Sequence, residues 1–108
     1  MNKDYRQYGV DFKEVHCYFD IHKALYDGLE LPEYYGANLD ALWDCLTDKN
    51  LNDLHIDLKN YDDMEKLDRE YAGKLLSVFQ DFKHCYDDEY IHTIIIRVFR
   101  GEEMEEIK

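Results

Sequence analysis

The chain has 108 residues, the length of one domain with a modest hydrophobic core. Its 25 Asp and Glu against 13 Lys and Arg give a net charge of −12, which argues against general nucleic-acid binding and against binding to anionic membranes. Ten Tyr, five Phe and one Trp are more aromatic side chains than a disordered acidic chain carries. Composition therefore predicts a folded acidic domain that attracts a basic partner.

Targeting signals and the number of cysteines indicate the cellular compartment of the protein. The first ten residues carry Lys3, Asp4 and Arg6 and lack the apolar segment of a secretory signal. The most apolar run, Ile94–Ile96, is far shorter than the roughly 18 residues of a membrane span. Three cysteines are a small, odd set that fits reduced thiols better than a disulfide framework. These features predict a cytoplasmic protein that does not bind membranes.

The first elements follow hydrophobic spacing and turn residues. Residues 7–12 are expected to form a short strand, weakened by a central glycine. Apolar residues at helical spacing predict a helix from Asp20, as its N-cap, to Gly28. The proline-containing segment 29–37, here called the aromatic loop, comes next, and Gly36 is expected to supply a backbone angle that other residues resist.

The middle of the chain predicts two capped helices with a strand between them. Asn38 is expected to cap a helix that ends near Asp48. Residues 54–58 alternate apolar and polar side chains with the period of a strand. Asp62 resembles the first residue of a capping box and opens a short helix through Leu67.

The last part of the chain completes the predicted fold. A helix is expected over residues 70–85, and the continuous β-branched run 92–99 is typical of a strand buried on both faces. Residues 100–108, with four glutamates, are expected to be a frayed tail or a short solvated helix. Strands joined through helices predict an α/β fold with a three-stranded parallel sheet and about four helices. We expect one domain over residues 1–108, with its core at about 7–99.

The most distinctive polar pattern lies in the aromatic loop and the helix after it. Tyr34 and Tyr35 precede a helix on which Asp40, Asp44 and Thr47 share one face. Two carboxylates one turn apart serve acid–base chemistry, bind a divalent cation, or present fixed negative charge to a cationic cleft. An exposed helix face does not separate the two pKa values, and a hard cation needs more oxygen ligands. A plain solvated helix face is the alternative.

Other chemical motifs are missing from the sequence. The His and Cys residues do not have the spacing of a zinc site. Neither a glycine-rich phosphate loop nor a serine-nucleophile motif is present, so no metal, cofactor or catalytic residue is predicted. Trp43 is expected in the apolar stripe beside Asp44, at the border of a partner surface. Cys17, Cys45 and Cys85 are expected to be small buried side chains.

One segment resembles a known family. Residues 31–47, LPEYYGANLDALWDCLT, closely resemble the central segment of the barstar family of ribonuclease inhibitors. Weaker similarity extends over roughly residues 10–99. The resemblance implies the barstar fold, a three-stranded parallel sheet with helices, which agrees with the elements expected above. It also implies an inhibitor that is not an enzyme and whose partner is a small basic ribonuclease, bound one-to-one.

The resemblance also implies roles for individual residues. Asp44 would take the place of an RNA phosphate among the Arg and Lys side chains of the ribonuclease, and Asp40 would add a second acidic contact. Tyr34 would stack on the catalytic histidine of the enzyme, and Asp81 occupies a position where the family places a peripheral glutamate. The full set of expected partner-binding residues is Tyr34, Tyr35, Gly36, Asn38, Asp40, Trp43, Asp44, Thr47 and Asp81.

Departures from the family pattern leave alternatives open. Asp48 and Lys49 stand where the best-known member of the family has a glycine and an aromatic residue, and Lys49 does not favour a basic partner. The second hypothesis is an acidic adaptor of the same fold that binds a basic protein other than a nuclease. The third is an enzyme that uses Asp40 and Asp44.

Overall fold

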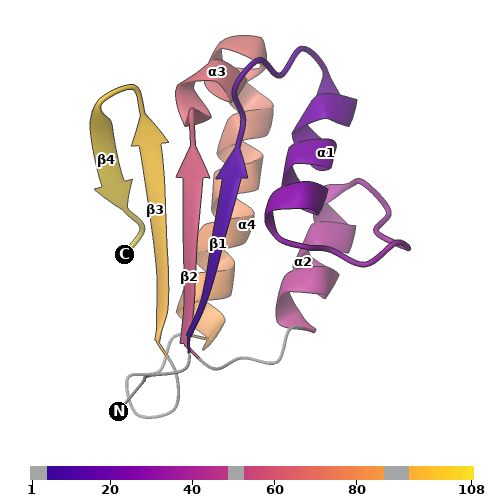
Figure 1. The fold of residues 1–108 in the computed structure, drawn as a ribbon, viewed down its shortest axis with the longest axis vertical. Helices are drawn as coiled ribbons and strands as arrows, with labels where there is room; N and C mark the ends of the chain where they lie inside the picture. The colour runs from indigo at the N-terminus through magenta and orange to yellow at the C-terminus, as the bar shows by residue number, and fades with distance from the viewer. Residues whose placement is uncertain (1–4, 49–52, 87–92) are drawn as a thin grey trace.

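The computed structural model describes residues 5–48, 53–86 and 93–108, and within them it has four helices and four strands (Figure 1). The predicted α/β class is confirmed, and the predicted count of three strands is one too few. The elements in chain order are β1 (Tyr5–Asp11), α1 (Tyr18–Gly28), α2 (Leu39–Thr47), β2 (Asp53–Lys59), α3 (Tyr61–Leu67), α4 (Arg69–Tyr86), β3 (Ile94–Arg100) and β4 (Glu103–Glu106).

The described strands form one sheet in the order β1-β2-β3-β4. β1, β2 and β3 are parallel neighbours, with Tyr8 paired to Ile56 and Ile56 to Ile96. Burial alternates along β1 and β3, and Figure 1 shows α4 running behind the sheet, so helices cover one face. The prediction that the last strand is buried on both faces is therefore wrong. That strand was also expected to begin at His92, which lies outside the described residues.

Hydrogen bonds from Arg97 and Gln7 to Asp57 join the three parallel strands on the uncovered face. Arg97 donates from Nε to Oδ1 of Asp57 at 2.8 Å and from its second terminal nitrogen to Oδ2 at 2.9 Å. Gln7 donates to Oδ2 of the same carboxylate at 3.4 Å. The planar guanidinium matches a carboxylate in this two-pronged geometry, which fixes the register of β2 against β3.

The segment expected to be a frayed or helical tail forms a strand instead. Gly101 adopts a φ of 59°, which allows a tight turn after β3, and β4 then runs antiparallel to β3. Ile107 is only 5% exposed, and its N–H donates to the carbonyl of Ile96 at 2.8 Å. Arg100 also donates to Glu105 at 3.0 Å. Antiparallel pairing with β3, the buried Ile107 and the ion pair of Arg100 with Glu105 therefore hold this acidic segment on the sheet.

Replacing Ile107 with alanine is expected to lower the free energy of unfolding by about 2 kcal/mol, because it removes buried methyl groups. A urea titration followed by tryptophan fluorescence measures the change. The matched control is Met104→Ala in the same segment, where the side chain is 51% exposed and the cost is expected to be below about 0.5 kcal/mol. Equal stability of the two variants would mean that the segment does not dock on the sheet in solution.

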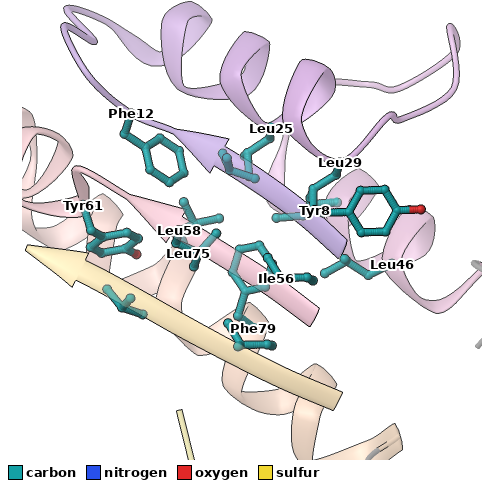
Figure 2. Close-up of a cluster of buried hydrophobic side chains, with 14 of the residues drawn as sticks. Tyr8, Phe12, Leu25, Leu29, Leu46, Ile56, Leu58, Tyr61, Leu75 and Phe79 are labelled. Atoms are coloured by element: carbon teal, nitrogen blue, oxygen red, sulfur yellow. The ribbon is translucent and has the colours of Figure 1, made fainter. Parts of the chain in front are cut away.

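The hydrophobic core lies between the sheet and the helices (Figure 2). Phe12 and Tyr61 meet edge to face with ring centroids 5.6 Å apart, and the Tyr61 hydroxyl donates to the carbonyl of Ala72 at 2.5 Å. The ring of this fully buried tyrosine is therefore packed against another aromatic ring, and its hydroxyl has a hydrogen-bond partner. None of the helices in the described ranges is long and apolar enough to cross a membrane.

Two predicted helix starts are wrong. α1 begins at Tyr18, and the carboxylate of Asp20 accepts the N–H of His16 at 2.9 Å. Cys17 is the N-cap, and Asp20 lies in the first turn of the helix, where its carboxylate holds the backbone of the residue before the N-cap. α3 begins at Tyr61 after Asn60, which is left-handed with a φ of 54°. Asp62 accepts the N–H of Gly101 at 3.3 Å instead.

Candidate functional site

The aromatic loop between α1 and α2 is held by a few backbone hydrogen bonds. The N–H of Leu31 donates to the carbonyl of Tyr26 at 3.0 Å, and that of Tyr35 donates to the carbonyl of Pro32 at 2.9 Å. Glu30 and Ala37 bracket the loop with φ angles of 54° and 53°. The expectation that Gly36 supplies a positive φ is wrong, because the chain makes that turn at Ala37.

Asn38 ties the end of the loop to the start of α2. Its Oδ1 accepts the N–H of Ala41 at 2.8 Å, and its Nδ2 donates to the carbonyl of Gly36 at 3.2 Å. The predicted N-cap is confirmed, since the side chain satisfies one of the free N–H groups of the first turn. The same amide also fixes the position of Gly36 relative to the helix.

α2 is amphipathic, and its orientation decides which side chains are displayed. Leu42 and Leu46 are fully buried, which turns Asp40 and Asp44 toward solvent. Trp43 is half-buried, with its ring centroid 6.4 Å from that of Tyr86 in α4. It therefore lies at the border between core and surface.

An open hollow of about 500 Å³ lies between the aromatic loop and α2. Tyr34, Asp44 and Thr47 line it, so the structure brings together three of the residues expected from the sequence. Asp40 lies one turn earlier on α2, outside this hollow. The other residues that line the hollow are Glu30, Pro32, Cys45 and Asp48. We call this feature the acidic hollow.

Two carboxylates of the acidic hollow were not predicted from the sequence as site residues. Glu30 and Asp48 are both exposed and, with Asp44, give it three carboxylates. Within the described part of the chain, neither Asp40 nor Asp44 makes an ion pair or hydrogen bond through its side chain. The negative charge of this face is thus left available to a cation of another molecule. Lys49, at its expected edge, lies outside the described residues.

The remaining expected residues fall into different roles. The Thr47 hydroxyl donates to the carbonyls of Trp43 at 2.9 Å and Asp44 at 3.2 Å, which keeps it on the last turn of α2. Asp81 is exposed on α4 and does not line the acidic hollow. It could only contribute at the periphery of a larger interface.

The two tyrosines of the loop are not equivalent. Tyr34 is 79% exposed, whereas Tyr35 is partly buried against the core. The hydroxyl of Tyr35 lies 2.6 Å from Nδ1 of His22 in α1. Burial raises the pKa of the Tyr35 hydroxyl far above its usual value of 10, so this side chain stays neutral. Tyr34 is therefore the tyrosine of this loop that is accessible to another molecule, and Tyr35 anchors the loop to the core.

Burial also lowers the pKa of His22 below its usual value of 6.5. Below that value the unfolded chain binds more protons than the folded one, so the free energy of unfolding is expected to fall as the pH drops from about 7.5 through 6.5. The loss should level off once the pH is below the folded-state pKa. Urea midpoints measured along this pH series test the expected slope.

His22→Gln should remove most of that slope, since the amide does not titrate. His16→Gln is the matched control, because His16 is exposed, and it should retain the slope of the parent. A slope that survives in His22→Gln would assign the pH dependence to another group.

The described residues give little support for a metal site or a reactive thiol. There, no group of three or more His, Cys, Asp or Glu side chains is placed to hold a metal ion. None of the three cysteines forms a disulfide; Cys17 and Cys85 are exposed and Cys45 is half-buried. The prediction that they are small buried side chains is wrong for Cys17 and Cys85, because each lies at the end of a helix. Cys45 is partly buried and packs against the core.

The described residues thus form an α/β domain that presents an acidic helix and an exposed tyrosine beside an open hollow. Comparison with known proteins gives the family. The family model described as Barstar (barnase inhibitor) matches residues 5–97, and the chain belongs to the barstar family.

A curated relative agrees with that assignment. The chain is similar to the Bacillus subtilis (strain 168) protein named "Putative ribonuclease inhibitor YrdF". The two are 39% identical over 82 residues, which cover 76% of this chain and 87% of the relative. The resemblance inferred from residues 31–47 is thus confirmed at the level of the family.

Proposed function

We propose that this chain inhibits a small basic ribonuclease by binding one-to-one and blocking its active site with α2 and the aromatic loop. Family membership and the name of the relative support a ribonuclease as partner. The proposal includes action in the cytoplasm, no enzymatic activity and no cofactor.

The observation that carries the proposal is the display of Asp44. This carboxylate is fixed on a helix whose opposite face buries Leu42 and Leu46, and it lines the acidic hollow beside Tyr34. An active site built for a phosphodiester holds Arg and Lys side chains. A rigid carboxylate satisfies the same donors, and charge-assisted bonds to Arg are the strong kind. It offers no bond for the enzyme to cleave.

The net charge of the chain is also consistent with a basic ribonuclease as the partner. A net charge of −12 repels RNA and attracts a cationic protein, so it raises the association rate. Because added salt screens this attraction over about 10 Å at 0.1 M, the association rate should fall with salt more than the dissociation rate rises.

The direct test titrates the protein into an RNA-cleavage assay of a barnase-type ribonuclease. We expect inhibition to reach its end point at an equimolar ratio, and to weaken in the double variant Asp40→Asn/Asp44→Asn. Hen lysozyme, a basic protein of similar size, is the control for attraction by charge alone.

Capture on the immobilised protein at low and high salt, followed by an RNA-cleavage assay of the eluate, extends the test to unknown partners. A basic protein that elutes without ribonuclease activity and binds through Asp44 would favour the adaptor hypothesis instead. That result would overturn the proposal.

A further inference from the structure

A buried hydrogen-bonded cluster connects the aromatic loop to α4, a helix that contributes nothing to the acidic hollow. His22 of α1 is 4% exposed and lies at its centre. Its Nδ1 is 2.6 Å from the Tyr35 hydroxyl, and its Nε2 is 2.6 Å from the Tyr71 hydroxyl. One imidazole thus links a residue of the loop to a residue at the start of α4.

Tyr71 is itself held firmly at this place. Its N–H donates to Oδ1 of Asp68 at 3.0 Å, and its ring lies against that of Tyr18 with centroids 4.6 Å apart. The Tyr18 hydroxyl donates to the other oxygen of Asp68. Backbone, ring and hydroxyl of Tyr71 therefore each have a partner, which makes it a rigid support for His22.

The donor and acceptor pattern makes the two tyrosines interdependent. Since burial disfavours the charged form, His22 is a neutral imidazole with one N–H donor and one acceptor nitrogen. One tyrosine must then donate and the other accept. If Tyr71 loses its hydroxyl, one buried nitrogen has no partner in this cluster, and the tautomer and orientation that suit Tyr35 are no longer selected.

We propose that Tyr71 is a positioning residue for the aromatic loop, acting through His22 and Tyr35. Tyr35 points inward because it is bound there, and Tyr34, its neighbour, consequently points out beside the acidic hollow. A loop ordered before binding loses less entropy when it binds, so the cluster raises affinity without touching the partner. This effect on affinity rests on the proposed function, whereas the effect on the loop does not.

The test compares Tyr71→Phe with Tyr26→Phe, which removes a hydroxyl from an exposed residue of α1 outside the cluster. In the free protein we expect the Tyr35 amide to exchange with deuterium about tenfold faster in Tyr71→Phe and at the parental rate in Tyr26→Phe. The Ala41 amide, capped by Asn38, should keep its rate in both and serves as the internal reference. Equal exchange of the Tyr35 amide in the two variants would overturn the proposal.

Binding separates this proposal from the proposed function. Against a barnase-type ribonuclease, Tyr71→Phe should bind about tenfold more weakly, equivalent to about 1.4 kcal/mol, and Tyr26→Phe should bind as the parent does. Faster exchange with no inhibition by the parent protein would reject the ribonuclease and keep the positioning role. Parental affinity in Tyr71→Phe despite faster exchange would reject the role in binding.

A double-mutant comparison keeps the test decisive if Tyr71→Phe is unstable. Tyr35→Phe removes the hydroxyl at the other side of His22 and should speed exchange of its own amide to the same extent. Adding Tyr71→Phe to it should change that rate less than twofold, because the two hydroxyls act through one imidazole. Additive effects would show that the tyrosines are independent and would contradict the proposal.

Discussion

Replacing Asp44 with alanine is expected to weaken ribonuclease inhibition by about 2–5 kcal/mol. Complexes of this family are among those from which that range was obtained. Asp44 is the carboxylate that the acidic hollow places beside Tyr34. In the complex its removal leaves cationic side chains of the enzyme desolvated and without their anion. Isothermal titration calorimetry with a barnase-type ribonuclease measures the loss.

The same substitution should not harm the free protein. Asp40 and Asp44 lie one helical turn apart, and such like charges destabilise a helix by about 0.2–0.5 kcal/mol. Thermal unfolding of Asp44→Ala is therefore expected at or slightly above the parental temperature. A clear loss of stability would show that this carboxylate has a structural role instead.

A charge control separates local contact from overall attraction. Glu102→Ala, at the exposed turn between β3 and β4, changes the net charge by the same single unit. We expect it to slow association slightly and to leave the dissociation rate unchanged. If it weakens binding as much as Asp44→Ala does, affinity reflects total charge and not the acidic hollow.

Gly28→Ala is expected to lower the free energy of unfolding by about 3 kcal/mol, because α1 has no room for a methyl group at its end. A Cβ there would lie 2.6 Å from the carbonyl oxygen of Gly9 and 2.8 Å from Cα of Val10. Both are backbone atoms of β1, so neither can turn aside. α1 would have to move away from the sheet and open the core along β1.

Gly73 provides the matched control for this prediction. It lies inside α4, and a Cβ there would meet no atom within 4 Å. Gly73→Ala should raise the free energy of unfolding by about 0.5–1 kcal/mol through helix propensity alone. Urea titrations of the two variants should therefore shift in opposite directions, and a stabilised Gly28→Ala would contradict the close packing of α1 on β1.

Elements with local signals could be predicted from the sequence almost to the residue. α2 is the best example, because Asn38 caps it and the buried positions Leu42 and Leu46 repeat at helical spacing within one short segment. The resemblance at residues 31–47 pointed to the same place in the chain. The exposure of Asp40 and Asp44 follows directly from the orientation of this helix.

Features that depend on distant residues could not be predicted in the same way. The direction of Tyr35 depends on His22, 13 residues earlier, and His22 in turn is held by Tyr71, 49 residues later. The acidic hollow includes Glu30 because the chain turns there through a positive φ, and no residue type signalled that turn. β4 was missed because glutamates disfavour strands, whereas hydrogen bonds from β3 stabilise this one.

β4 also has a consequence for how the protein behaves at high concentration. Without it, β3 would be the edge of the sheet, and its sequence IIIRVFR is an apolar, β-prone run with free backbone groups, the type of edge that recruits other chains into aggregates. β4 covers that edge with four exposed residues, three of them glutamates. Like-charged edges of two molecules repel each other. Part of the acidity of this chain thus works against self-association, on the part of the sheet farthest in strand order from β1.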